Sequence, residues 1–167
     1  MSNPNNDIYA KRRAAVAQQL DADSIAIIPT APERQRNRDS DFLYRHDSYF
    51  YYLTGFSEPN STLVIHSNGG STLFCPPKDQ EREIWDGFRF GPAAAVAEFG
   101  FDEAYSISQL DEMLPKLLAN QSRLFYSLGS DATWDTKVTA CLNQVKAQAR
   151  TGVSAPDDVA DVRKLLD

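Results

Sequence analysis

The fold class of this sequence is decided by one stretch, Ser61-Thr62-Leu63-Val64-Ile65-His66-Ser67-Asn68-Gly69-Gly70-Ser71-Thr72-Leu73-Phe74. Two runs rich in apolar and β-branched residues flank Asn68-Gly69-Gly70, a turn sequence typical of a tight β-hairpin. Because successive side chains of a strand point to opposite faces, Leu63 and Ile65 are expected on the same side. The stretch therefore predicts two antiparallel strands with a buried face.

The sequence before this hairpin predicts a helix and two further strands. Asp7 can cap a helix that runs to about Leu20, and the isoleucine-rich run 24–28, ended by Pro29, is typical of a buried strand. The segment 30–48 mixes arginines and aspartates without periodicity and is expected to be a long polar loop. The aromatic run 49–54 is interpreted as a strand with half of its aromatic side chains in the core, so three consecutive antiparallel strands are expected.

The sequence after the hairpin favours alternating helices and strands. We expect a charged connection over 78–84, a small helix over 93–99 and a strand over 123–128. Ser108 and Asp111 resemble a capping box for a helix to about 119, which Pro115 should kink or shorten. A second long helix is expected from Asp131 to about Arg150. The prediction is an α/β fold whose mixed sheet of five or six strands is flanked by helices and has this core: Ile25, Ile27, Leu63, Ile65, Leu73, Phe125 and Leu128.

Composition narrows the classes of function. The chain has 167 residues, a size that suits one globular domain, and its formal net charge of -6 argues against nucleic acid or an anionic membrane as partner. Cys75 and Cys141 are too few for a disulfide framework, so both are expected to be buried thiols. The N-terminal residues lack the apolar run of a signal peptide, and the sequence has no stretch long enough to span a membrane. A cytoplasmic location is therefore expected.

The sequence offers little support for chemistry within this chain. It has two histidines, His46 and His66, and contains no nucleophile elbow, phosphate-binding loop, dinucleotide fingerprint or C-x-x-C pair. Three aspartates, at positions 39, 41 and 47, could be imagined as a metal cluster, but arginines alternate with them. Interleaved opposite charges more often form a solvated or interface network. We expect neither a metal site nor a catalytic residue in this chain.

One longer pattern is more specific. The residues are Arg38-Asp39-Ser40-Asp41-Phe42-Leu43-Tyr44-Arg45, followed by Ser48-Tyr49-Phe50-Tyr51-Tyr52-Leu53-Thr54-Gly55-Phe56-Ser57-Glu58-Pro59. They resemble the N-terminal domain of Xaa-Pro aminopeptidases (aminopeptidase P). The resemblance extends to Arg12-Arg13, to Glu83-Ile84-Trp85 with Gly87 and Arg89, and more loosely to 159–166.

This resemblance implies a fold and an activity for the longer protein. In that family the N-terminal domain is a mixed six-stranded sheet flanked by helices, similar to ribonuclease H and shared with creatinase and prolidase. A second domain, of pita-bread fold, holds two metal ions, typically manganese, and removes the N-terminal residue from Xaa-Pro peptides. Residues 1–167 would then be a single N-terminal domain without the catalytic one, inactive in isolation.

The resemblance also implies roles for particular residues. Family members are dimers or tetramers in which this domain covers the active-site mouth of a neighbouring subunit, where it assists oligomerisation and substrate selection. Asp39, Trp85 and Arg89 would contact peptide substrate in trans, although Trp85 could equally be packing and Asp39 could pair with a nearby arginine. The remaining implied residues belong to the loop or interface: Arg38, Tyr44, Arg45 and His46, the last standing where relatives more often have glutamine.

Two other functions remain open at this point. A stand-alone protein or peptide-binding module could use the same fold without peptidase chemistry, although the sequence has no acidic tail or long linker of the kind a chaperone relative carries. The chain could also be the N-terminal domain of a prolidase or creatinase. The run ending in Gly55-Phe56-Ser57-Glu58-Pro59 favours aminopeptidase P among the three.

Overall fold

The computed structural model describes residues 6–30, 49–56, 58, 60–86, 89–129 and 131–165. Its centre is a mixed six-stranded sheet with the order β4-β3-β2-β1-β5-β6. Strands β1, β2 and β3 form an antiparallel meander, and β4, β5 and β6 each pair in parallel with a neighbour. The strands are β1 (Ser24–Pro29), β2 (Thr62–His66), β3 (Ser71–Cys75), β4 (Glu103–Ser106), β5 (Arg123–Phe125) and β6 (Asp158–Ala160).

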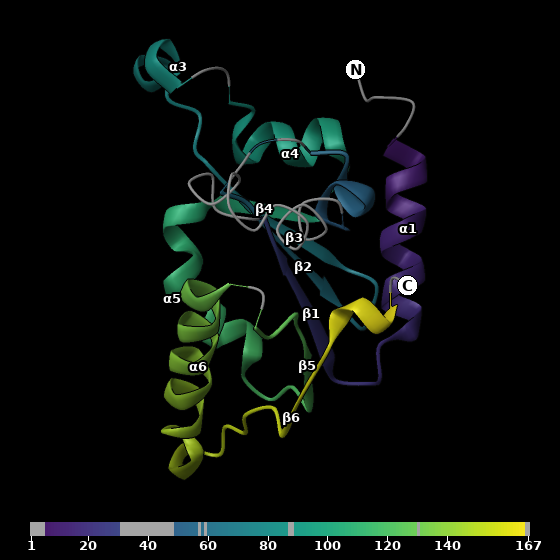
Figure 1. The fold of residues 1–167 in the computed structure, drawn as a ribbon, viewed down its shortest axis with the longest axis vertical. Coiled ribbons are helices and arrows are strands. Elements are labelled where there is room, and N and C mark those ends of the chain that lie inside the picture. The colour runs from purple at the N-terminus through teal and green to yellow at the C-terminus, as the bar shows by residue number, and fades with distance from the viewer. Residues whose placement is uncertain are drawn as a thin grey trace.

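Helices cover both faces of this sheet (Figure 1). One face packs against α1 and α4, and the other against α5 and α6. The helices are α1 (Asn6–Gln19), α3 (Gln80–Asp86), α4 (Gly91–Phe99), α5 (Leu110–Leu118) and α6 (Ala132–Lys146), with the short 3₁₀ turns η2 (Ile107–Gln109), η3 (Ala149–Thr151) and η4 (Val162–Leu165). The predicted α/β class and the predicted mixed sheet of six strands are confirmed.

The core consists of two clusters, one on each face of the sheet, and successive strand residues alternate between them as predicted. Leu63 and Ile65 lie in the cluster beneath α1, whereas Ile25 and Ile27 lie in the cluster beneath α5 and α6. All four side chains are fully buried. A central strand buried on both faces needs apolar residues at every position, which is why β1 is a continuous apolar run. Leu128, by contrast, is 61% exposed, because β5 ends at Phe125 and the chain turns outward before α6.

The expectation for 49–54 was wrong, because these residues are helical. Phe50 and Leu53 are buried, three positions apart, while Tyr51 and Tyr52 are about half exposed. That is the period of a helix turn and not of a strand. The aromatic and β-branched content of the run suggested a strand, but tertiary packing decided otherwise. The predicted meander is therefore wrong in its first strand, because β2 pairs with β1 on one side and with β3 on the other.

Three boundaries also differ from the sequence-based expectation. Part of the predicted charged connection over 78–84 is helix α3. The cap near 108 comes from Ser106, whose hydroxyl accepts from the backbone N–H of Ser108, so the Ser108 capping box is wrong. Pro115 lies inside α5, which ends at Leu118. Asp131 caps α6 as the sequence indicates, and that helix ends at Lys146.

Candidate functional site

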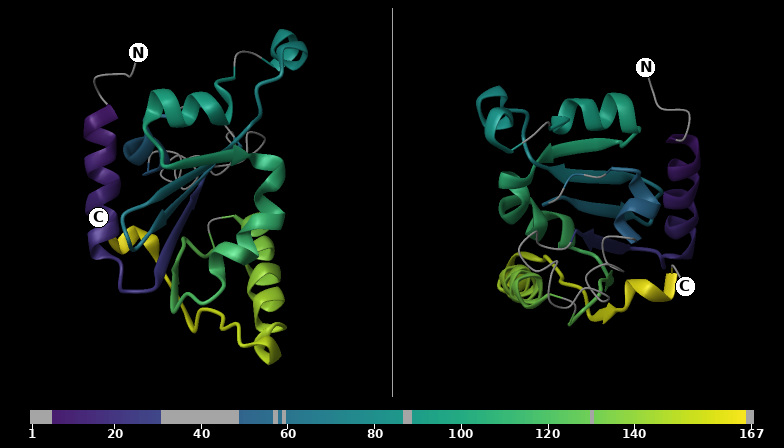
Figure 2. Two further views of the ribbon diagram at one scale, coloured as in Figure 1. Left: turned by 180° about the vertical axis from the view of Figure 1, so that it is seen from behind. Right: turned by 45° about the horizontal axis from the view of Figure 1, so that its top comes forward.

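Helix α3, together with the chain on either side of it as far as Lys78 and Gly91, is here called the arm. It carries the most exposed large apolar side chains among the described residues. Helix α3 stands away from the body of the molecule, between β3 and α4 (Figures 1 and 2). On it Ile84 is 80% exposed and Trp85 is 87% exposed. Two consecutive large apolar side chains exposed on one projecting helix are more informative than a single one, and aromatic residues are enriched at contact surfaces.

The two ends of the arm are tied together by charged groups. Lys78 Nζ lies 2.8 Å from Glu83 Oε1 and also donates to the carbonyl oxygen of Arg89 at 3.0 Å. The backbone N–H of Arg89 donates to the same carboxylate oxygen of Glu83 at 2.7 Å. The hydrogen bond from Lys78 lowers the pKa of Glu83, and the bond from Arg89 lowers it further. The arm is therefore closed at its base by a three-residue polar clamp.

Close backbone approach completes this closure. Gly91 has φ +82°, and a Cβ at this position would lie 2.8 Å from Lys78 Cβ. The backbone at Lys78, before α3, and the backbone at Gly91, at the start of α4, thus pass in contact, which requires glycine at position 91.

A buried carboxylate joins the arm to the rest of the domain. Glu58 is 6% exposed, and its Oε2 accepts a hydrogen bond of 2.8 Å from the backbone N–H of Phe90. Its Oε1 lies 3.9 Å from Arg89 Nε. Burial raises the pKa of Glu58, against the effect of the Phe90 hydrogen bond and the Arg89 charge, which lower it. Glu58, which follows the 49–54 helix in the chain, therefore couples this part of the domain to the base of the arm.

Two consecutive arginines of α1 hold the 49–54 helix from its C-terminal end. Arg13 donates to the carbonyl oxygen of Leu53, and Arg12 donates to that of Tyr52, both at 3.0 Å. These carbonyls have no partner within a helix that ends there, so cationic donors are favourable. Arg13 is buried and stacks over Phe101 at 4.4 Å, and burial lowers its pKa to about 10, so it stays charged at neutral pH.

The structure brings together part of the predicted site. Trp85 lies on the arm and Arg89 lies at its base, so these two residues share one substructure. The other predicted positions lie outside the described residues: Asp39, Arg38, Tyr44, Arg45 and His46. The sequence-based interpretation missed Lys78, Glu83 and Glu58 as the residues that hold the arm. The available signal was Glu58 itself, a carboxylate within the run Gly55-Phe56-Ser57-Glu58-Pro59 that carries the family resemblance.

The described residues offer no centre for metal or nucleophilic chemistry. In the ranges given above, no group of three or more His, Cys, Asp or Glu side chains could hold a metal ion. Cys75 and Cys141 are free and buried as expected, and burial raises the pKa of Cys75 to about 12, which disfavours its thiolate. His66 Nε2 lies 3.3 Å from Thr72 Oγ1, and burial lowers its pKa. Within the same residues, no helix has the length and apolarity to cross a membrane.

Comparison with known proteins matches both the sequence and the fold. Residues 9–126 match the family model described as aminopeptidase P, N-terminal domain. The Xaa-Pro aminopeptidase of Escherichia coli is 33% identical over 99% of this chain and 38% of its own length. A solved Pseudomonas aeruginosa aminopeptidase PepP is 38% identical with a TM-score of 0.86, and covers 99% of this chain and 38% of that one. Zinc-substituted E. coli aminopeptidase P in complex with product is 34% identical with a TM-score of 0.85, and covers 97% and 38%. This chain thus spans less than two fifths of each of these relatives.

Proposed function

This chain belongs to the aminopeptidase P family, and we propose that residues 1–167 are the N-terminal, non-catalytic domain of an Xaa-Pro aminopeptidase. The longer protein would remove the N-terminal residue from peptides whose second residue is proline. The names of the relatives and the match to the N-terminal family model support this proposal. Two free, buried thiols are consistent with a reducing compartment such as the cytoplasm, where we place the protein.

The metal centre belongs, on this proposal, to the remaining part of the longer protein. Two manganese ions there would activate a water molecule and polarise the scissile carbonyl. The described residues of this chain do not fit such a centre, because none of their acidic, histidine or cysteine side chains converge in threes. The contribution of this domain is then to bind and position peptide and to assist assembly, and the isolated domain is inactive.

The main support for a role in peptide binding is the arm. Trp85 exposes 87% of its surface on a short helix whose base is fixed by Lys78, Glu83 and Glu58. A rigid indole presented in this way offers a flat apolar wall for a proline ring or a peptide side chain. In a dimer or tetramer the arm would reach the metal site of a neighbouring subunit, with Arg89 beside it.

The segment 30–48, which the sequence predicts to be a polar loop, is the second surface of the proposal. Asp39 would orient this loop or an arginine across the subunit boundary, and Arg38, Tyr44, Arg45 and His46 would contribute to the same interface. Support comes from the anchoring of the helix that follows the loop, since Arg12 and Arg13 fix its last carbonyls. Glu58 then links this helix to the arm, so the two surfaces share one support.

Mixed oligomers of the longer protein test the proposal. Subunits with one metal ligand replaced would be combined with subunits carrying Trp85→Ala, and Xaa-Pro hydrolysis would be measured at several mixing ratios. Recovered activity is expected, because an oligomer can then combine an intact metal site with an intact tryptophan from a neighbour. The control is Val159→Ala, which also truncates an exposed apolar side chain. Val159 lies in β6, the edge strand at the other end of the sheet from β4, and its replacement should leave activity unchanged. Loss that stays additive at every ratio would show that Trp85 does not act on the metal site of a neighbouring subunit.

A further inference from the structure

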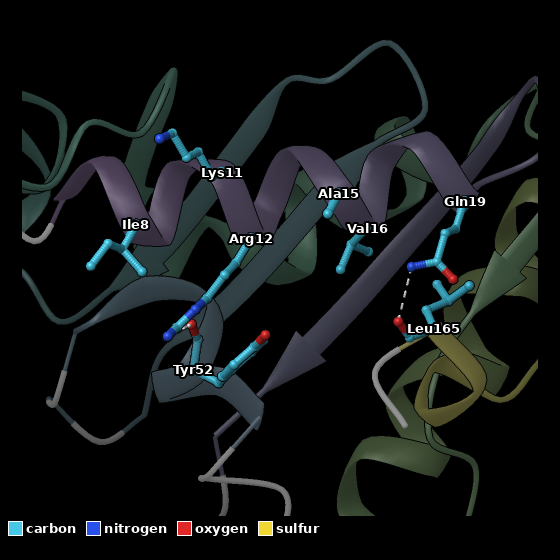
Figure 3. A pocket seen from close by; sticks show the side chains of 8 residues that line it. All are labelled: Ile8, Lys11, Arg12, Ala15, Val16, Gln19, Tyr52 and Leu165. Atoms are coloured by element: carbon cyan, nitrogen blue, oxygen red, sulfur yellow. Dashed lines mark hydrogen bonds between the residues drawn. The ribbon is translucent and has the colours of Figure 1, made fainter.

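A groove of about 350 Å³ runs along α1 on the side that faces the 49–54 helix (Figure 3). It is built by three parts of the chain that are far apart in sequence: α1, the 49–54 helix and η4. Its lining residues are Ile8, Lys11, Arg12, Ala15, Val16, Gln19, Tyr52 and Leu165.

The groove is apolar along its length and cationic at one end. Ile8 is 48% exposed and Tyr52 is 47% exposed, and both line the groove (Figure 3). Lys11 and Arg12 supply its charge, and no carboxylate lines it among the residues that the structure describes. Covering such a surface removes apolar area from water, which is favourable by roughly 25 cal/mol per Å².

The end of the described chain already lies in this groove. Leu165 is both a lining residue and the last residue of η4, and its carbonyl oxygen accepts a hydrogen bond of 3.1 Å from Gln19 Nε2. This bond fixes the position of the backbone at one end of the groove. The relatives described above continue well beyond the length of this chain, which covers 38% of the E. coli protein.

We propose that the groove along α1 is filled by the polypeptide that follows Asp167 in the longer protein, in a helical conformation. The existence of that polypeptide rests on the proposed function. From Gln19 to Ile8 the axis of α1 is about 16 Å long, which a helix of about eleven residues spans. An amphipathic helix there would place its apolar face against the half-exposed side chains of Ile8 and Tyr52.

This docking makes the connection to the second domain a packed part of the first. A helix held between α1 and the 49–54 helix contacts the same element that Arg12 and Arg13 anchor. The orientation of the metal-binding domain would then be set by burial in the groove and not by a flexible linker.

Cysteine labelling tests this assignment. Ala15 and Ala14 are both exposed on α1, but Ala15 lines the groove and Ala14 does not. Ala15→Cys and Ala14→Cys would each be made in the 167-residue chain, in the chain extended by about twelve residues of its own reading frame, and in the longer protein. Reaction with a thiol reagent is read against a slow background, because Cys75 and Cys141 are buried.

We expect the Ala15→Cys thiol to react at least about tenfold more slowly in both longer forms than in the 167-residue chain, with Ala14→Cys unchanged. Equal reactivity in all forms would overturn the inference, as would a reading frame that stops at residue 167. Protection only in the longest form would assign the groove to another part of the protein, and protection that grows with the concentration of the 167-residue chain would assign it to a second copy. Xaa-Pro hydrolysis by the longest form is measured separately, so protection without activity contradicts the proposed function alone.

Discussion

The ring of Tyr9 lies against the backbone of Gly55, so closely that a Cβ at position 55 would be 2.4 Å from Tyr9 Cε2. Gly55 has φ +67° and its backbone N–H donates to the carbonyl oxygen of Tyr51, which ends the 49–54 helix. The first helix and the glycine of the aromatic motif therefore depend on each other.

The first prediction follows from this contact. Gly55→Ala should destabilise the domain more than Gly100→Ala, which has a similar φ of +78° but no atom within 4 Å of the added Cβ. Gly100→Ala should cost about 1–2 kcal/mol for the left-handed backbone alone. Gly55→Ala should cost at least about 1 kcal/mol more, because the ring of Tyr9 must move. Urea unfolding of the two variants measures this, and equal losses would show that Tyr9 yields without strain.

The second prediction concerns pH. Burial raises the pKa of Glu58 above its ordinary value of 4.5, so the folded state holds this proton more tightly than the unfolded state does. The resulting stability is fully present below the unfolded pKa and is lost as pH rises through the folded one. The stability of the wild type relative to Glu58→Gln should therefore decrease as pH rises from about 4.5 toward neutrality. Urea unfolding across this range is the measurement, and a relative stability that rises with pH would contradict it.

The third prediction separates the two arginines of α1. Arg13→Ala should cost about 2–4 kcal/mol, because it removes a buried charged donor to Leu53 and the packing over Phe101. Arg12→Ala removes an equally short bond at an exposed site and should cost under about 1 kcal/mol. Arg13→Lys keeps the charge but loses the planar stacking, and an intermediate loss is expected. Similar losses for both alanine variants would mean that burial of Arg13 does not matter.

The fourth prediction contrasts the two tryptophans. Trp85→Ala should change the free energy of unfolding by less than about 0.5 kcal/mol, since the side chain is exposed, whereas Trp134→Ala in α6 should cost about 3–5 kcal/mol. In the longer protein Trp85→Ala should still lower turnover efficiency on Xaa-Pro peptides on the order of 10²-fold. Peptide hydrolysis and chemical unfolding, measured on the same preparations, decide this. A stability loss large enough to account for the lost activity would refute a positioning role.

The fifth prediction concerns metal. The 167-residue chain should bind no Mn²⁺ ion stoichiometrically, because its aspartates between positions 39 and 47 alternate with arginines that compete for them. Calorimetric titration with Mn²⁺ is the test. A saturable site of micromolar affinity would reveal a metal centre in this chain.

The central strands β1, β2, β3 and β5 could be predicted because they follow local rules, whereas the short edge strands β4 and β6 were not predicted. The β2–β3 hairpin has its turn residues at the tip, and the apolar run of β1 is long enough for a strand and too short for a helix. The 49–54 helix could not be predicted in this way. Its stability depends on Arg12 and Arg13, which lie forty residues earlier and whose contacts with its carbonyls exist only in the folded domain.

The candidate site likewise contains residues that the sequence indicated and residues whose role depends on contacts that only the folded domain makes. Trp85 and Arg89 stood out through the family resemblance, and the structure places both on the arm or at its base. The role of Glu58 was hidden, since its partner Phe90 is 32 residues away and the contact arises only when the arm folds back. For Leu128 the sequence predicted a core position that the residue does not have. It is apolar and follows strand β5, but its side chain is exposed.

The sheet order also has a consequence for synthesis on the ribosome. β1 pairs on one side with β2, which follows soon in the chain, but on its other side Ser24 pairs with Arg123 of β5. A nascent chain that has not yet reached position 123 can close the β1–β3 meander while the second edge of β1 stays open. An apolar edge strand exposed for that interval is a site for aggregation or chaperone binding. Pausing of translation between β3 and β5 should therefore lower the yield of folded protein more than pausing after β6.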